Sequence, residues 1–128
     1  MTPILPKDLV TLYEQDSFVQ VIVNQINSPA ADQFRVQVKG LVGSLDAVLV
    51  AAAYRSNPRP CLFVMNDREE AAYFQNDLQN LLGQEVLYYP MSFKRPYHYE
   101  EIDNANVLMR AEILNKLNSA PPAPDGGG

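Results

Sequence analysis

The chain has 128 residues, 47% of them hydrophobic, and a formal net charge of −5. This length suits one domain, and the apolar content is enough for a packed core rather than wholesale disorder. The negative charge argues against a general binder of nucleic-acid backbones, which normally presents a basic face, but it leaves room for a local basic patch. With one cysteine and one histidine, the chain has no internal disulfide, cysteine zinc cluster or histidine-rich metal site.

Targeting signals are absent from the sequence pattern. The first residues lack the basic segment and apolar run of a signal peptide. No apolar run approaches the roughly 20 residues that span a bilayer. We therefore expect a cytoplasmic protein that has no membrane partner.

Residues 1–28 are predicted to be a helical segment. Apolar residues fall on two faces at helical spacing: Leu9, Leu12 and Tyr13 on one, and Phe18, Ile22 and Ile26 on the other. Asp16 or Ser17 is the expected cap of the second half, and Pro29 ends it. The pattern is typical of an amphipathic cover packed on a domain, and the alternative is a free partner-binding helix.

Residues 29–118 alternate predicted strands with predicted helices. The strands are the alternating run 34–39, the continuous apolar run 61–65, and the run 85–89 that ends at Pro90. A helix over 45–54 is apolar nearly all round, so we expect it to be buried on more than one side. Residues 119–128 are rich in proline and glycine and predict a linker.

Two further helices complete this pattern. One begins at Asn66 or Asp67, with Glu69 or Glu70 as a capping-box partner, and stops at Gly83. The other begins at Asp103 or Asn104, and its apolar side holds Val107, Leu108, Ala111, Leu114 and Leu117.

The order of elements predicts an α/β fold, with a small parallel sheet flanked by helices. Three strands make a thin sheet for this class. We therefore expect the chain to be a fragment of a larger module.

The segment 39–47 has the layout of a phosphate-binding loop, G-x-x-x-x-G-K-[ST], between a strand and a helix. Gly40 takes the first glycine position, Gly43 is an additional glycine, and Ser44 is the expected helix cap. The remaining positions have lost their chemistry: the second glycine, the lysine and the metal-binding hydroxyl are replaced by Leu45, Asp46 and Ala47.

Asp46 reverses the charge that a phosphate loop needs. At about 4 Å and an effective dielectric near 20, one like-charge contact costs on the order of 4 kcal/mol. The helix dipole returns only about 0.3–1 kcal/mol. We therefore expect a degenerate loop that binds no nucleotide, and a chain that uses no cofactor or metal and has no catalytic residue.

Other polar residues are weaker candidates. A cluster of carboxylates could do acid–base work, but a helix start is its more frequent role: Asp67, Glu69 and Glu70. Cys61 lies in an apolar run and is expected to be buried. His98 has no partner histidine or cysteine, and Arg110 is expected to form a structural ion pair.

One further stretch interleaves basic and aromatic residues: Phe93, Lys94, Arg95, Tyr97 and Tyr99. This mixture suits stacking on bases and contact with phosphates. It also suits a protein or interdomain contact, and plain packing is the third possibility. Acidic residues follow at once and offset the positive charge.

The order of several motifs resembles the bacterial transcription-repair coupling factor family. The resemblance covers roughly residues 34–118. Its motifs are Gly40 to Ser44 entering an alanine-rich helix, the stretch 60–67, Glu70-Ala71, Asp77-Leu78, Tyr89-Pro90, Pro96-Tyr97 and the helix over 110–117.

The resemblance implies a particular architecture. In that family the N-terminal region is similar to the excinuclease subunit UvrB, with a degenerate copy of UvrB's phosphate loop. Gly40, Gly43 and Ser44 match the loop, whereas 45–47 depart from it as the coupling factor does. UvrB also has a long aromatic hairpin, for which the stretch 88–99 is too short, and Arg95 stands where the family has an apolar residue.

The resemblance also implies a role. The family displaces RNA polymerase stalled at DNA lesions and recruits the repair protein UvrA, and an ATP-dependent DNA translocase in a separate C-terminal region supplies the motor. We expect this chain to be a non-catalytic subdomain that contacts neighbouring subdomains. UvrA would bind the following subdomain, and RNA polymerase and DNA would bind other regions. The alternatives are a small α/β nucleotide-binding or enzymatic domain and a freestanding DNA-binding module.

Overall fold

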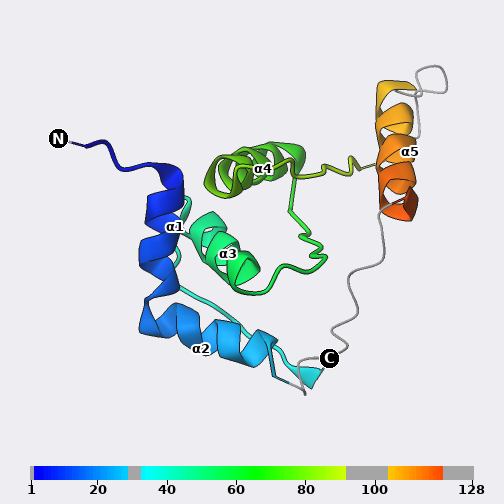
Figure 1. The fold of residues 1–128 in the computed structure, drawn as a ribbon. Coiled ribbons are helices and arrows are strands. Elements are labelled where there is room, and N and C mark those ends of the chain that lie inside the picture. Colours follow the sequence, from blue (N-terminus) through cyan, green and yellow to red (C-terminus); the bar gives the residue numbers. More distant parts are fainter. Residues whose placement is uncertain (1, 29–32, 92–103, 120–128) are drawn as a thin grey trace.

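The computed structural model describes residues 2–28, 33–91 and 104–119 (Figure 1). These residues form five helices: α1 (Pro6–Glu14), α2 (Ser17–Ile26), α3 (Leu45–Ser56), α4 (Arg68–Leu82) and α5 (Asn104–Ser119). No described residue belongs to a strand. None of the described helices is long and apolar enough to cross a membrane.

Helix α3 is the centre of the packing. It contacts α1, α2 and α4, and Figure 1 shows these three helices around it. The buried side chains come from all four helices: Val10, Val19, Val23, Ala47, Val48, Ala51, Ala52, Leu78 and Leu81. The prediction that residues 45–54 are buried on more than one side is confirmed. Helices α1 and α2 do pack on α3, but through Val10, Val19 and Val23. The faces predicted for 1–28 were misplaced, because Leu12 and Phe18 are 62% and 56% exposed.

Local signals explain where the helices begin and end. The Asp16 carboxylate accepts hydrogen bonds from the backbone N–H groups of Phe18 and Val19, at 2.9 and 3.2 Å, and so caps α2 as predicted. Asp67 caps α4 in the same way, and Gly83 ends α4 in the left-handed conformation at φ +66°.

Polar contacts join α1 to α3, and α2 to the segment that follows α3. The Arg55 guanidinium pairs with the Glu14 carboxylate at 3.1 Å and also donates to the Lys7 carbonyl at 3.2 Å. Beyond α3, Arg59 donates to the carbonyl oxygen of Ile26, at the end of α2. The first two contacts support the packing of α1 on α3, and the third ties the end of α2 to the chain that leaves α3.

The predicted parallel sheet is wrong. Residues 34–39, 61–65 and 85–89 run as irregular segments without strand pairing, so the part of the chain that the structure describes is all-α and not an α/β, UvrB-like fold. The run expected to be the most buried is outside the core, with Leu62 and Val64 88% and 87% exposed. Helices α1, α2 and α4 take the sides of α3 that a sheet would cover. Because β-propensity depends on neighbouring strands, these runs do not form strands alone.

Helix α5 stands apart from the other four helices in Figure 1. It lies against the segment 84–91, where Arg110 covers the Tyr89 ring at 4.8 Å and Lys116 pairs with Glu85 at 3.0 Å. Ile113 is its buried apolar residue. The side predicted to be apolar is mainly exposed: Val107, Leu108, Ala111, Leu114 and Leu117.

Candidate functional site

The turn before α3 contains two glycines whose backbone conformations favour glycine. Gly40 and Gly43 have positive φ angles of +79° and +61°, in the left-handed region that favours glycine. The Leu45 N–H donates to the Val42 carbonyl at 3.3 Å and closes the turn into α3. Ser44 takes the predicted N-cap position, but its hydroxyl makes no capping hydrogen bond.

Asp46 places a negative charge in the first turn of α3. Its Oδ1 accepts a hydrogen bond from the Ala47 N–H at 2.7 Å, and the side chain is half-buried. Leu45 packs against the apolar core, and Ala47 is fully buried in it. The carboxylate thus takes one of the backbone donors that a phosphate would need, and it stabilises the first turn of α3.

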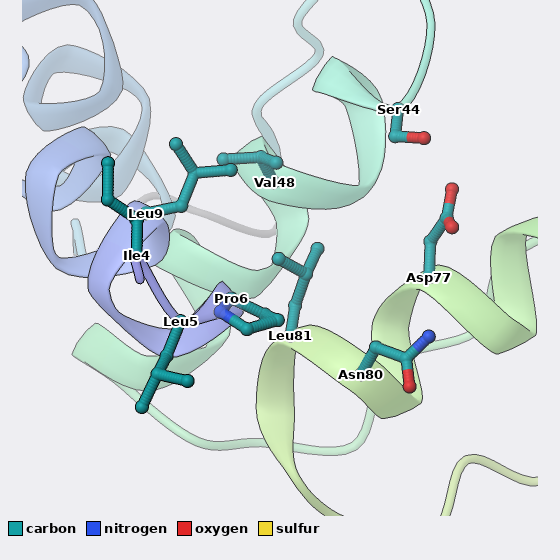
Figure 2. A pocket seen from close by; sticks show the side chains of 9 residues that line it. All are labelled: Ile4, Leu5, Pro6, Leu9, Ser44, Val48, Asp77, Asn80 and Leu81. Carbon is teal, nitrogen blue, oxygen red and sulfur yellow. The ribbon is translucent and has the colours of Figure 1, made fainter. Parts of the chain in front are cut away.

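A pocket lies beside this turn, between α3, α4 and the chain leading into α1 (Figure 2). Its volume is about 340 Å³. The apolar part of the lining is made by Ile4, Leu5, Pro6, Leu9, Val48 and Leu81. The polar part is made by Ser44, Asp77 and Asn80.

The polar side chains gather at one end of the pocket. Figure 2 shows the Asp77 carboxylate pointing toward the Ser44 hydroxyl, with Asn80 one turn further along α4. Asp77 is half-buried, whereas Ser44 and Asn80 are exposed. Among the described residues, none of these side chains has a hydrogen-bond or ion-pair partner. The pocket therefore offers unused acceptors next to an apolar wall.

The carboxylate cluster at the start of α4 is a helix start, as predicted. Asp67 Oδ1 accepts from the Glu70 N–H at 2.8 Å. Glu70 Oε2 accepts from the backbone N–H and the side-chain amide of Asn66, at 3.2 and 2.9 Å. Both carboxylates thus accept backbone hydrogen bonds at the N-terminus of α4. Glu69 is exposed beside them and lines no part of the pocket.

The other predicted site residues are dispersed. Cys61 is exposed, so its predicted burial is wrong. Arg110 lies over the Tyr89 ring, and among the described residues it forms no ion pair of the kind that was expected. His98 and the contact stretch of Phe93, Lys94, Arg95, Tyr97 and Tyr99 lie outside the described residues. Within the described part of the chain, no cluster of His, Cys, Asp or Glu could hold a metal ion.

Asp77 and Asn80 are the site residues that sequence reasoning missed. From the sequence, Asp77 is part of the Asp77-Leu78 motif and has no predicted role of its own. Their spacing of three places them on one face of α4. No sequence signal places that face beside Ser44, because the proximity comes from the packing of α3 on α4.

Comparisons of this chain with protein-family models, curated proteins and solved structures found no match.

Proposed function

We propose that this chain is a non-catalytic interaction unit of a transcription-repair coupling factor. Its helical core is the base on which neighbouring parts of the same protein dock. In this proposal the whole protein removes stalled RNA polymerase and recruits UvrA, whereas its motor and its DNA contacts lie in other regions. Because the described residues are helical, the structural role does not depend on a UvrB-like sheet.

The observation that carries the proposal is the exposed apolar run 61–65. Leu62 and Val64 are almost fully solvent-exposed, whereas Phe63 between them packs on Phe74 of α4 with ring centroids 5.4 Å apart. The segment is thus held to the core by one side chain and presents two others outward. Exposed apolar surface of this kind is typical of protein contact sites.

A second exposed apolar surface supports the same role. On α5, Leu108 is 69% exposed and lies away from the side that carries Arg110, Ile113 and Lys116, through which the helix is attached. A helix fixed on one side and apolar on another suits docking against a further element. The order of the motifs over residues 34–118 supports the choice of family.

Asp46 supports the non-catalytic part of the proposal. The altered loop places a carboxylate where a nucleotide-binding protein carries a lysine, and that carboxylate is bound to its own helix. The chain therefore contributes positioning and contact surface rather than a nucleotide-dependent step.

A binding experiment tests the docking surface. The neighbouring region of the same protein, produced separately, should be captured by the immobilised 128-residue chain. Replacing Leu62 and Val64 together by aspartate should abolish capture without lowering the melting temperature, because both side chains are outside the core. Replacing the exposed Ala72 and Asn76 of α4 by aspartate adds the same two negative charges elsewhere and is the matched surface control. Capture that survives the Leu62 and Val64 changes would overturn the assignment of this surface.

A second pull-down tests the partner. The 128-residue chain alone should not capture UvrA from the same organism, whereas a longer chain that includes the following subdomain should. Equal capture by both would place the UvrA contact within these residues, and the stretch from Phe93 to Tyr99 would then be the first place to mutate.

A further inference from the structure

We propose that the pocket between α1, α3 and α4 binds a small primary amine with an apolar body. The ammonium group would lie at Asp77, and the body would lie against Leu9, Val48 and Leu81. This site is independent of the docking surface at Leu62 and Val64, which does not line the pocket.

The size and lining of the pocket fit a small ligand. Its volume of about 340 Å³ falls within the roughly 300–1,000 Å³ that is typical of ligand sites. Such sites combine a mainly apolar wall with a few polar groups that orient the ligand. Here the polar groups are confined to one end, so a bound molecule would have one polar end and one apolar end.

The charge of the polar end selects a cation. The described ion pairs join Arg55 to Glu14, and Lys116 to Glu85 and Glu112, and none of them uses Asp77. A half-buried carboxylate without a cationic partner favours an incoming positive charge. The chain's net charge of −5 acts in the same direction.

The number of acceptors favours a primary ammonium. An –NH₃⁺ group carries three donors and no acceptor. The two oxygens of the Asp77 carboxylate and the Ser44 hydroxyl oxygen supply three acceptors that face one another, and no other described residue uses them. The match in number and charge would make these hydrogen bonds charge-assisted, which is the stronger class.

An anion at the start of α3 is the competing occupant, and the structure disfavours it. A helix N-terminus carries about half a positive charge, which is less than the full negative charge of the facing Asp77 carboxylate. Asp46 has also taken the Ala47 N–H with its own carboxylate. A phosphate at this position would therefore meet two carboxylates and fewer free donors.

Amide chemical shifts measured by NMR test the proposal with three matched probes at neutral pH. These are 2-phenylethylamine, the alcohol 2-phenylethanol and the carboxylate 3-phenylpropionate. The amine should shift the backbone amides of Ser44, Val48, Asp77 and Asn80 in a saturable way. The alcohol should bind more weakly, and the carboxylate should not shift these amides.

Two variants locate the interaction. Asp77→Asn should weaken amine binding by about tenfold, because the side chain can still accept a hydrogen bond but no longer carries the negative charge. Ile4→Ala, at a residue 75% exposed on the apolar side of the pocket, should weaken binding of the amine and the alcohol alike. Glu69→Gln removes the same charge elsewhere on α4 and should leave binding unchanged. Unchanged amine affinity in Asp77→Asn, equal binding of all three probes, or shifts confined to other residues would each overturn the proposal. If Asp77→Asn does not fold, the Ile4→Ala titration and the order of the three probes decide it.

Discussion

Gln75 donates its side-chain amide hydrogen to the carbonyl oxygen of Val86 at 2.8 Å. One turn later on α4, Gln79 accepts a hydrogen bond from the Val86 N–H at 3.2 Å. Both backbone polar groups of one residue are thus satisfied by side chains of a single helix. This pair does for residue 86 what a neighbouring strand would have done in a sheet.

The glutamine contacts predict separable effects on Val86. Gln79→Ala should speed hydrogen exchange of the Val86 amide, because it removes the acceptor of that N–H. Gln75→Ala should leave this exchange less affected, since it removes only the donor to the carbonyl. Each change should lower the free energy of unfolding by about 0.5–1.5 kcal/mol. Asn76→Ala, exposed on α4, is the control. Equal exchange rates in all three variants would contradict the anchoring role.

A pair of leucines distinguishes the helical core from a sheet core. Leu78 is 2% exposed, so Leu78→Ala should lower the free energy of unfolding by about 2–5 kcal/mol. Leu62 is 88% exposed, so Leu62→Ala should change it by no more than about 0.5 kcal/mol. Urea unfolding of both variants measures the difference. A loss at Leu62 as large as that at Leu78 would mean that the run 61–65 is buried, against this structure.

The ends of the helices were the part of the fold that could be predicted from sequence. Asp16, Asp67 and Gly83 act on backbone groups within a few residues, so their effect depends little on the rest of the chain. The apolar composition of residues 45–54 likewise predicted burial on several sides. These inferences use local chemistry only.

The absence of strands from the described residues could not be predicted in this way. The runs 61–65 and 85–89 have strand-like composition, but a strand needs a neighbour to take its backbone hydrogen bonds. Val86 is hydrogen-bonded to two glutamine side chains of α4, and Phe63 packs on Phe74 of α4, so both segments attach to this helix instead. The pocket could not be predicted for a related reason. Ser44 and Asp77 are far apart in sequence, and only the packing of the helices brings them together.

Nucleotide should not stabilise this chain. A ligand that binds the native state raises the melting temperature by mass action. Because Asp46 occupies the lysine position and is bound to Ala47, millimolar Mg–ATP should leave the melting temperature unchanged. Differential scanning fluorimetry is sufficient to measure this. A reproducible rise that disappears in Gly43→Ala, relative to that variant's own melting temperature, would restore a nucleotide-binding function.

DNA binding should be weak and sensitive to salt. The net charge of −5 leaves no reason to expect an extended basic face. Fluorescence anisotropy with single- and double-stranded DNA should show at most weak binding at physiological salt. Submicromolar binding that is lost when Lys94 and Arg95 are both replaced by alanine would favour the freestanding DNA-binding module instead.

The attachment of α5 should weaken at alkaline pH. The hydrogen bond to Glu85, and then the charge of Glu85, raise the pKa of Lys116 above its ordinary value. Because the lysine pKa is higher in the folded than in the unfolded protein, the charged side chain stabilises the fold. This contribution is complete below the unfolded pKa of about 10.4 and is lost as the pH rises through the folded pKa. The stability difference between the wild type and Lys116→Met should therefore shrink above about pH 10.5. Arg110→Met is the comparison, since arginine stays charged throughout this range. A difference at Lys116 that is constant through this range would contradict the ion pair with Glu85.

The exposure of Cys61 gives this chain a built-in attachment point for thiol-reactive labels. Since it is the only cysteine, a maleimide dye or nitroxide would attach at one position without any engineered residue. That position is next to Leu62 and on the segment fixed by Phe63, so the label would sense whatever covers this surface. In the unlabelled protein, the rate at which the Cys61 thiol reacts would fall when another part of the protein covers this surface.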